Sequence, residues 1–415
     1  MNGTKLYQKL AIVPIVALGL AVAGCNKQAD NGTITPTTTA NTSTTTTTGK
    51  NTTLNYSKNS PLDTSNMFTQ TDLTQTVDTT NAKKITLEDG KDVTIDAAGT
   101  YVITGTAKNS TVIVNASADT EVHLVFDNVS ITNTNKPTVY AVNAKNVYVT
   151  TTQNSTNNLK VTGEFTEDDG NDINAVIFAK TNITLNGLGT LNIDSSANGV
   201  ASNSDLKITG GIYNVNTIKH GFKALNSIRV ADGTFNINAT KDGFHSENED
   251  DLTTGYVYIA GGNFTINSED DGIQGTSITE IDGGTFAINA VEGIEGTYVQ
   301  INDGTIKIYA TDDGINASEK ATNYDVQIEI NGGNLDITMA EGDTDALDAN
   351  GTLTINGGYI NITAQFAFDF DLTASLNGGT VIVNGTQVTS ITNSMMEGGE
   401  GPGGQPGQGG FGGPR

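Results

Sequence analysis

The fold is decided by a short motif that reads GGNFTINS at residues 261–268 and GGTFAINA at residues 283–290. A third copy, DGTFNINA at residues 232–239, has aspartate in place of the first glycine. The pattern Gly-Gly-x-φ-x-φ-x-small, where φ is apolar, alternates with a period of two, which predicts a short strand with one buried face. The Gly-Gly or Asp-Gly pair in front of each strand predicts a turn.

The motif recurs through the C-terminal two-thirds of the chain, and this repeat predicts a solenoid. Regular copies are 22 residues apart, and two steps of 29 residues contain insertions at residues 246–251 and 318–323. Such a period suits one coil of a right-handed parallel β-helix, an all-β fold with three short strands per coil. A leucine-rich repeat would need its leucine and asparagine signature, and a propeller blade is about twice as long. The second glycine of each copy is Gly189, Gly211, Gly233, Gly262, Gly284, Gly304, Gly333, Gly358 or Gly379.

Stacking of the coils would turn each position of the motif into a column. The apolar positions two and four residues after the second glycine, such as Phe264 and Ile266, share one face and should form the core. The position five residues after it predicts a ladder of side-chain amides, because like amides in neighbouring coils can hydrogen-bond. The consecutive asparagines of that ladder are Asn216, Asn238, Asn267 and Asn289.

Both ends of the chain differ in composition from this repeat. Residues 1–24 are typical of a lipoprotein signal peptide, because a positive start and a short apolar stretch lead to Cys25, the chain's one cysteine. We expect export, a lipid on Cys25 and anchoring at the bacterial cell surface. The threonine-rich residues 25–83 predict a disordered tether, residues 84–395 the β-helix, and the glycine-rich residues 396–415 a flexible tail.

The chain is strongly acidic, with 46 acidic and 21 basic residues and a formal net charge of −25. Such a charge argues against nucleic acid as a partner, because phosphates would be repelled. It favours divalent cations, which could also link the protein to an acidic polymer. Nothing in the repeat indicates oligomerisation, and we expect a monomer.

A second motif, acid-Gly-apolar-polar, follows the first by about nine residues, as in Asp271-Gly272-Ile273-Gln274. Stacked coils would place these acids about 4.8 Å apart, where unpaired carboxylates repel one another. Ca²⁺ would relieve the repulsion, since it takes six to eight oxygen ligands, whereas Zn²⁺ prefers His and Cys, of which the chain has few. The alternative is that these acids are solvated turn residues. The predicted Ca²⁺ ligands are Asp242, Glu247, Asp270, Asp271, Glu292, Glu295, Asp312, Asp313, Asp345 and Asp348.

Five segments together resemble a family of exported bacterial right-handed β-helix carbohydrate-binding domain proteins, which are similar in fold to pectate-lyase-like polysaccharide lyases. The resemblance implies Ca²⁺ in acidic turns and binding of plant-type or acidic polysaccharide, such as cellulose or pectin. Asn198 and His220 depart from the acidic consensus, so the resemblance does not extend Ca²⁺ to the first coils. The segments are GTYVITG at 99–105, VHLVFDNVSI at 122–131, NGLGTL at 186–191, DGFHSEN at 242–248 and DALDANG at 345–351.

Three functions are compatible with the sequence. The first is a calcium-dependent polysaccharide-binding surface lipoprotein. The second is a calcium-dependent polysaccharide lyase, which would need a basic residue beside the metal for β-elimination; Lys223 and Lys241 are the candidates, and neither is distinctive enough to assign as catalytic. The third is a structural surface adhesin without a ligand.

Overall fold

The computed structural model describes residues 61–166, 173–342 and 344–394. The predicted signal peptide, Cys25, most of the predicted tether, Asp343 and the predicted C-terminal tail lie outside these residues. The described residues contain a 3₁₀ turn, η1 (Thr64–Asn66), and otherwise form β-strands joined by turns and loops, with an irregular segment before β1. Within them, no helix has the length and apolar character needed to cross a membrane.

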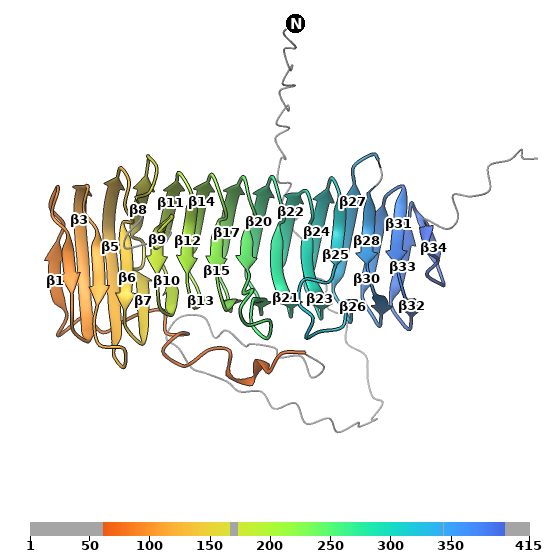
Figure 1. Cartoon of the computed structure of the whole chain (residues 1–415), viewed down its shortest axis with the longest axis horizontal. Coiled ribbons are helices and arrows are strands. Elements are labelled where there is room, and N and C mark those ends of the chain that lie inside the picture. Colours follow the sequence, from red (N-terminus) through yellow and green to blue (C-terminus); the bar gives the residue numbers. More distant parts are fainter. Residues whose placement is uncertain (1–60, 167–172, 343, 395–415) are drawn as a thin grey trace, which may run out of the picture. The chain divides into compact units, whose positions relative to one another are not determined.

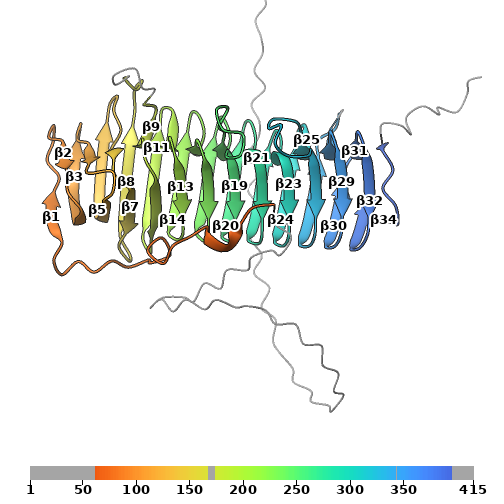
Figure 2. The ribbon, with the colours of Figure 1, turned by 60° about the horizontal axis from the view of Figure 1, so that its bottom comes forward.

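Each coil of the fold contributes one strand to each of three parallel sheets, and the coils stack along one axis (Figures 1 and 2). Every strand pairing among the described residues is parallel except that of β33 with β34. In a regular coil, Phe235 pairs with Tyr213 of the preceding coil, 22 residues earlier. The predicted parallel β-helix is therefore confirmed.

The first sheet contains the strands that begin each coil. They are β1 (Lys83–Thr86), β3 (Gly99–Lys108), β5 (Glu121–Asn133), β7 (Asn146–Thr151), β10 (Ile183–Gly187), β13 (Asp205–Ile208), β16 (Ser227–Val230), β19 (Tyr256–Ile259), β21 (Ile273–Ile281), β23 (Ile294–Ile301), β26 (Gln327–Ile330), β29 (Thr352–Ile355) and β32 (Thr373–Leu376).

The second sheet contains the strands of the glycine motif, and the C-terminal halves of β3 and β5 begin it. Its further strands are β8 (Thr156–Val161), β11 (Thr190–Ser195), β14 (Ile212–Thr217), β17 (Thr234–Ala239), β20 (Asn263–Ser268), β22 (Thr285–Ala290), β24 (Thr305–Ala310), β27 (Asn334–Met339), β30 (Tyr359–Thr363), β33 (Thr380–Val383) and β34 (Thr386–Val388).

The third sheet contains the strands that follow the acid-Gly turns, and the N-terminal parts of β21 and β23 belong to it. Its further strands are β2 (Val93–Ile95), β4 (Val112–Asn115), β6 (Val139–Asn143), β9 (Ala175–Ala179), β12 (Asn198–Ser202), β15 (Phe222–Ala224), β18 (Phe244–Ser246), β25 (Asp313–Ala317), β28 (Asp345–Ala349) and β31 (Phe366–Phe370).

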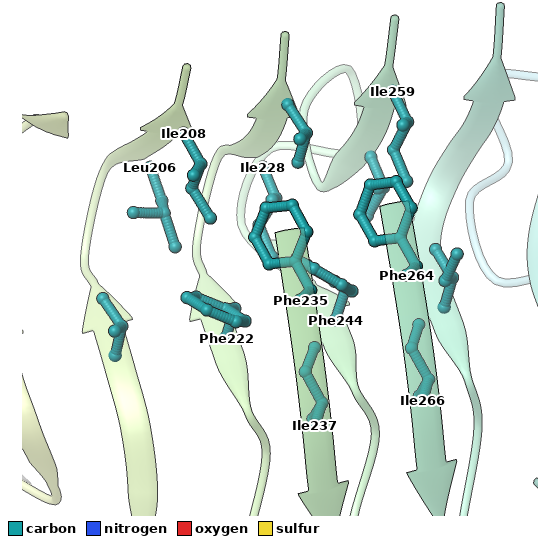
Figure 3. Close-up of a cluster of buried hydrophobic side chains, with 14 of the residues drawn as sticks. Leu206, Ile208, Phe222, Ile228, Phe235, Ile237, Phe244, Ile259, Phe264 and Ile266 are labelled. Carbon is teal, nitrogen blue, oxygen red and sulfur yellow. The ribbon is translucent and has the colours of Figure 1, made fainter. Parts of the chain in front are cut away.

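The core lies between the three sheets and is built from the predicted apolar columns. The rings of Phe235, Phe264 and Phe286 stack with centroids 4.7 and 4.4 Å apart, and Tyr213 extends the same stack. Phe244 of the third sheet meets Phe235 edge to face (Figure 3). Offset-stacked and edge-to-face rings are the favourable arrangements of aromatic side chains, so the repeat spacing also orders the core.

The second glycine of the motif is required by two constraints. Gly284 has φ of +114°, a conformation that side chains of L-residues rarely adopt. A Cβ at this position would lie 3.0 Å from the ring of Phe286 and 3.1 Å from the backbone oxygen of Gly262. The turn into the second sheet therefore needs a residue without a side chain in each coil.

The predicted amide ladder lies on the outer face of the second sheet. Asn238 Nδ2 donates to Asn216 Oδ1 at 2.9 Å, and Asn267 Nδ2 donates to Asn238 Oδ1 at 3.1 Å. A second ladder, two positions earlier in each strand, links Asn158, Asn192, Asn214 and Asn236. Amide side chains thus cross-link consecutive coils on the outside, where apolar packing is not available.

The predicted disordered tether extends too far toward the repeat, because residues 61–82 pack against the outer face of the first sheet. We call these residues the strap; in Figure 1 they run in orange to red along the coils. Gln75 accepts from Gly187 N at 2.8 Å and donates to Thr209 O at 2.9 Å, and Met67 is buried. Single side-chain hydrogen bonds hold the strap in place, and they leave no periodic pattern in its sequence.

Candidate functional site

The predicted acids lie in the turns between the second and third sheets, and backbone hydrogen bonds stack these turns. Gly243 N donates to Asp271 O at 3.0 Å, Gly272 N to Glu292 O at 2.8 Å and Gly293 N to Asp313 O at 2.9 Å. We call this column of side chains the acid column. Its members are Asp242, Asp271, Glu292, Asp313 and Asp345.

A second column runs beside the acid column on the third sheet, three residues further along each coil. Its strand register aligns His245 with Gln274, Gln274 with Glu295, and Glu295 with Asn316. We call it the polar column. It contains Lys223, His245, Gln274, Glu295, Asn316, Asp348 and Asp369.

Three predicted ligands from the two columns meet in the middle of the stack. Asp271, Glu292 and Glu295 each place a carboxylate oxygen within 4.8 Å of the others. We call these three residues the acidic centre. Asp271 and Glu295 are buried, and Gln274 Nε2 donates to Asp271 Oδ2 at 2.8 Å and also to Glu295.

Burial and charge repulsion in the acidic centre raise the pKa values of its carboxyls. Burial, together with the charges of Asp242, Glu295 and Glu292, raises the pKa of Asp271 to about 10. Burial and the charge of Glu295 raise the pKa of Glu292 to about 7. Since low-dielectric surroundings and like charges both disfavour carboxylates, the centre needs either protons or a cation at neutral pH.

One cation from the protein already reaches the acidic centre. Lys320 Nζ lies 2.8 Å from Glu295 Oε1, and Glu295 and Asp271 hold the pKa of Lys320 above its ordinary value despite burial of the amine. Lys320 comes from the second insertion. Tyr324, directly after that insertion, donates a 3.4 Å hydrogen bond to Thr253 O, two residues after the first. Both insertions flank the columns, and the sequence pattern gave no signal for the role of Lys320.

The remaining acids of the columns continue toward the C-terminus. Burial and the charge of Asp348 raise the pKa of Asp313 to about 8, and burial with Asp369 and Asp371 raises that of Asp348 to about 6. Asp345 N donates to Asp313 Oδ1 at 3.3 Å, and the side chain of Asp345 is buried. Asp312 lies in the same turn and is exposed.

The N-terminal end of the acid column has a different chemistry. Asp242 Oδ2 lies 2.5 Å from His245 Nδ1 and 3.3 Å from His220 Nδ1, and His245 Nε2 lies 3.1 Å from Glu247. Burial would raise the pKa of Asp242, but the two imidazoles hold it well below its ordinary range. Asp270 pairs with Lys241 at 2.5 Å near the surface.

Asp242 and Glu247 are predicted Ca²⁺ ligands, and His220 departs from the acidic consensus of the second motif. The structure brings all three to one place with His245. Stacking of adjacent turns is the signal that could have found them, since His220 stands one coil before Asp242 in the same column.

The donor set of the acidic centre suits a hard divalent cation. Three carboxylates converge there, and Asn316 Nδ2 donates to Glu292 Oε2 at 3.0 Å. Asn316 Oδ1 is buried and lacks a hydrogen-bond partner among the described residues. A rotation of this amide would add a carbonyl oxygen to the carboxylates, and carboxylate and amide oxygens are the ligands that Ca²⁺ prefers.

The outer face of the second sheet is a second candidate surface. It is formed by the two asparagine ladders, and Tyr309 stands in register with Asn289 at the end of the predicted ladder. Tyr309 and Tyr359 are both exposed, at 44% and 45% of their full areas. A row of amides with exposed aromatic rings can hydrogen-bond to sugar hydroxyls and stack on sugar rings.

The chain is similar to proteins described as carbohydrate-binding. The family model described as "Carbohydrate-binding domain-containing protein" matches residues 89–298 and 289–394. A curated relative of that name from Acetivibrio thermocellus is 33% identical over 124 residues, which are 29% of this chain and 43% of the relative. A solved structure entitled polysaccharide lyase-like protein from C. thermocellum, a gadolinium derivative, is 25% identical with a TM-score of 0.47, over 63% of this chain and 98% of that one.

Proposed function

Because the chain belongs to the family of carbohydrate-binding domain-containing proteins, we propose that it is a calcium-dependent polysaccharide-binding lipoprotein of the bacterial cell surface. Ca²⁺ binds at the acidic centre and at the C-terminal acids Asp312, Asp313, Asp345 and Asp348. The ligand is a plant-type or acidic polysaccharide, such as cellulose or pectin. A lipid on Cys25 anchors the protein.

The convergence of Asp271, Glu292 and Glu295 is the single observation that carries the calcium proposal. Three carboxylates at this distance, two of them buried, cannot all be ionised without a counter-ion, and Lys320 supplies only one positive charge. A dication supplies two and accepts irregular oxygen geometry. The same ion could accept carboxylate oxygens from a uronate, which would link the acidic protein to an acidic polymer.

The lyase alternative has support from one position, Lys320, which lies beside the acidic centre. A base for β-elimination must be unprotonated, whereas Lys320 Nζ is ion-paired with Glu295 Oε1 at 2.8 Å. Lys241 is tied to Asp270, and Lys223 stands in register with His245. Binding without cleavage is therefore the function that these contacts favour.

The test combines metal removal with two matched substitutions. Ca²⁺ at a hundredfold excess over its Kd stabilises a protein that binds it only when folded by about 2.7 kcal/mol. Asp271→Asn with Asp313→Asn should abolish most of this gain in melting temperature and keep the coil intact, since Asn preserves turn chemistry. Asp232→Asn, in the Asp-Gly turn of the first motif, is the control and should respond to Ca²⁺ as the wild type does.

Retention on insoluble cellulose, pectin and chitin, with and without chelator, separates the roles of the metal. Loss of retention in chelator supports Ca²⁺ as the link to the sugar, and retention that survives makes Ca²⁺ structural only. A melting curve unchanged by chelator, with no metal in the purified protein, contradicts the calcium proposal. A melting temperature that responds to Ca²⁺, without retention on any polymer, would favour the structural adhesin.

The anchoring proposal rests on the pattern that ends at Cys25 and has its own test. Cys25→Ser should release the protein from the membrane fraction or leave it unprocessed. A variant that fractionates and migrates as the wild type does would contradict the lipid anchor without affecting the polysaccharide proposal.

A further inference from the structure

We propose that His220, His245 and Asp242 form a second metal site, selective for a transition-metal dication of the Zn²⁺ class, at the N-terminal end of the acid column. The three side chains come from two consecutive coils. His220 precedes β15 in one coil, and in the next coil Asp242 precedes β18 and His245 lies in β18. One atom of each lies within 4.8 Å of the others. This site is independent of Ca²⁺ at the acidic centre.

The convergence of two imidazoles on one oxygen is the first observation. His245 Nδ1 and His220 Nδ1 lie 2.5 and 3.3 Å from the same atom, Asp242 Oδ2. The two rings are stacked with centroids 4.3 Å apart. Both Nδ1 atoms therefore face the point that the carboxylate oxygen occupies, and protons on both rings would place two like charges face to face.

His220 Nδ1 provides the second observation. This atom is buried, and no hydrogen bond to it forms within the described part of the chain, although Asp242 Oδ2 is near. A buried ring nitrogen without a hydrogen bond costs free energy unless another partner satisfies it. A metal ion between His220, His245 and Asp242 would be such a partner.

The surroundings of the three donors match those of metal-bound histidine and aspartate. His245 Nε2 lies 3.1 Å from Glu247 Oε2, so the ring nitrogen that points away from the site bonds a carboxylate. Metal-bound histidines almost always make such a contact, which fixes the tautomer that ligates through the other nitrogen. Asp242 Oδ1 accepts from Asp271 N at 3.2 Å, which leaves only Oδ2 for the ion.

This donor set distinguishes the ion. Two imidazole nitrogens and one carboxylate oxygen are ligands of Zn²⁺, at about 2.0–2.2 Å, whereas Ca²⁺ requires six to eight oxygens. Tetrahedral ligands on bonds of that length lie about 3.3 Å apart, the separation already found between His220 Nδ1 and Asp242 Oδ2. The ring of His245 would move back by less than about 1 Å.

The chain has only three histidines, which would argue against a Zn²⁺ site if they lay far apart in the fold. Stacking of β15 on β18 brings two of the three into contact, one coil apart. The acid column is thus divided by donor type, with nitrogen and oxygen donors at its N-terminal end and oxygen donors further along.

The test uses the full untagged chain with Cys25→Ser in every variant, so that neither a thiolate nor added histidines compete. Zn²⁺ is titrated against a chromophoric chelator in excess Ca²⁺, and Co²⁺ is added separately to record its visible d–d bands. We expect one Zn²⁺ per chain, bound in the presence of Ca²⁺, and Co²⁺ bands typical of a four-coordinate nitrogen and oxygen site.

Three variants assign the ligands. His220→Gln and His245→Gln should abolish Zn²⁺ binding and the Co²⁺ bands and keep the Ca²⁺ response. Glu247→Gln, which affects the site through His245, should weaken Zn²⁺ binding by about 10- to 100-fold. The control Asp313→Asn should bind Zn²⁺ as the parent chain does.

Two results would overturn the proposal: Zn²⁺ binding no tighter than that of Ca²⁺, or Zn²⁺ binding that His220→Gln leaves unchanged. Either would make the cluster a hydrogen-bonded histidine–carboxylate network only. The Co²⁺ spectrum of the parent chain keeps the test decisive if a histidine variant does not fold.

Discussion

Asp72 of the strap and Lys207 of β13 form an ion pair in which Oδ2 and Nζ lie 2.8 Å apart. Asp72 is 1% exposed, and its carboxylate also accepts hydrogen bonds from Thr184 and from the backbone and hydroxyl of Thr69. A segment 135 positions earlier in the chain is thereby attached to the outer face of the first sheet.

Removal of this carboxylate should detach the strap without unfolding the coils. Asp72→Ala leaves buried hydrogen-bond donors unpaired, at a cost of about 1–3 kcal/mol. We expect the free energy of local opening of residues 61–82 to fall by this amount. We expect amide exchange in the strap to accelerate by about tenfold or more. Asp78→Ala, an exposed aspartate in the same segment, is the matched control. Equal protection in wild type and Asp72→Ala would refute the attachment.

Stability of the metal-free protein should fall as the pH rises. The folded-state pKa values of Glu292 and Asp313, about 7 and about 8, lie above those of the unfolded chain, so the fold favours their protonated forms. Their deprotonation therefore costs stability progressively from about pH 4 up to the folded pKa values. The melting temperature in chelator should be higher at pH 5 than at pH 8.

Excess Ca²⁺ should reverse this trend, because the ion binds the deprotonated carboxylates. Melting curves across the same pH range, with Ca²⁺ and with chelator, measure the difference. Parallel pH profiles in the two conditions would show that the acids of the columns and the metal do not interact.

Lys320 should compete with Ca²⁺ for Glu295. Lys320→Ala removes the positive charge 2.8 Å from Glu295 Oε1, and we expect the affinity for Ca²⁺ to rise about tenfold. In chelator the same variant should be less stable by about 1–3 kcal/mol, since the buried carboxylate loses its partner. Calorimetric titration and melting curves test both.

Lys307→Ala is the control for Lys320, because Lys307 is an exposed lysine whose pair with Asp336 lies outside the two columns. It should change neither the affinity nor the melting temperature. A Ca²⁺ affinity that falls in Lys320→Ala would mean that this lysine supports the metal site and does not compete with it.

Tyr309 should contribute to polysaccharide retention through its exposed ring. Tyr309→Ala should weaken retention on the polymer that the wild type binds, and Tyr309→Phe should preserve it, since the ring and not the hydroxyl stacks on sugar. Stacked aromatic pairs contribute about 0.5–1.5 kcal/mol beyond buried area, and loss of a sugar contact of the same strength would weaken retention about twofold to thirteenfold. Equal retention by Tyr309→Ala would place the sugar on another surface.

The coil could be predicted from sequence because its determinants repeat. Gly284 must be glycine, Phe286 and Ile288 must be apolar, and the next coil presents the same demand 20 residues later, at Gly304. Each copy independently reports the same strand and the same inward face. The acid-Gly turns repeat in the same way, so the sequence also predicts the order of residues in the acid column.

Contacts made once could not be predicted in this way. The strap contacts the first sheet through single side chains such as Gln75, with no period to reveal the surface that it covers. Lys320 sits in an insertion, where the repeat gives no register. In the sequence His220 is only a departure from an acidic consensus. Its role as a candidate ligand depends on the neighbouring coil, where Asp242 and His245 face it.

If the proposed lipid on Cys25 holds the chain, the strap determines where a pulling force enters the fold. A pulling force that enters before residue 61 reaches Met67, Asp72 and Gln75 before it reaches β1. Together with Phe68, whose ring packs on Tyr258, these residues join the strap to four neighbouring strands, β10, β13, β16 and β19, so the load is divided among mid-stack coils before it reaches the terminal coil. The first coil, which among the described residues pairs with one neighbouring coil, is thereby shielded from tension.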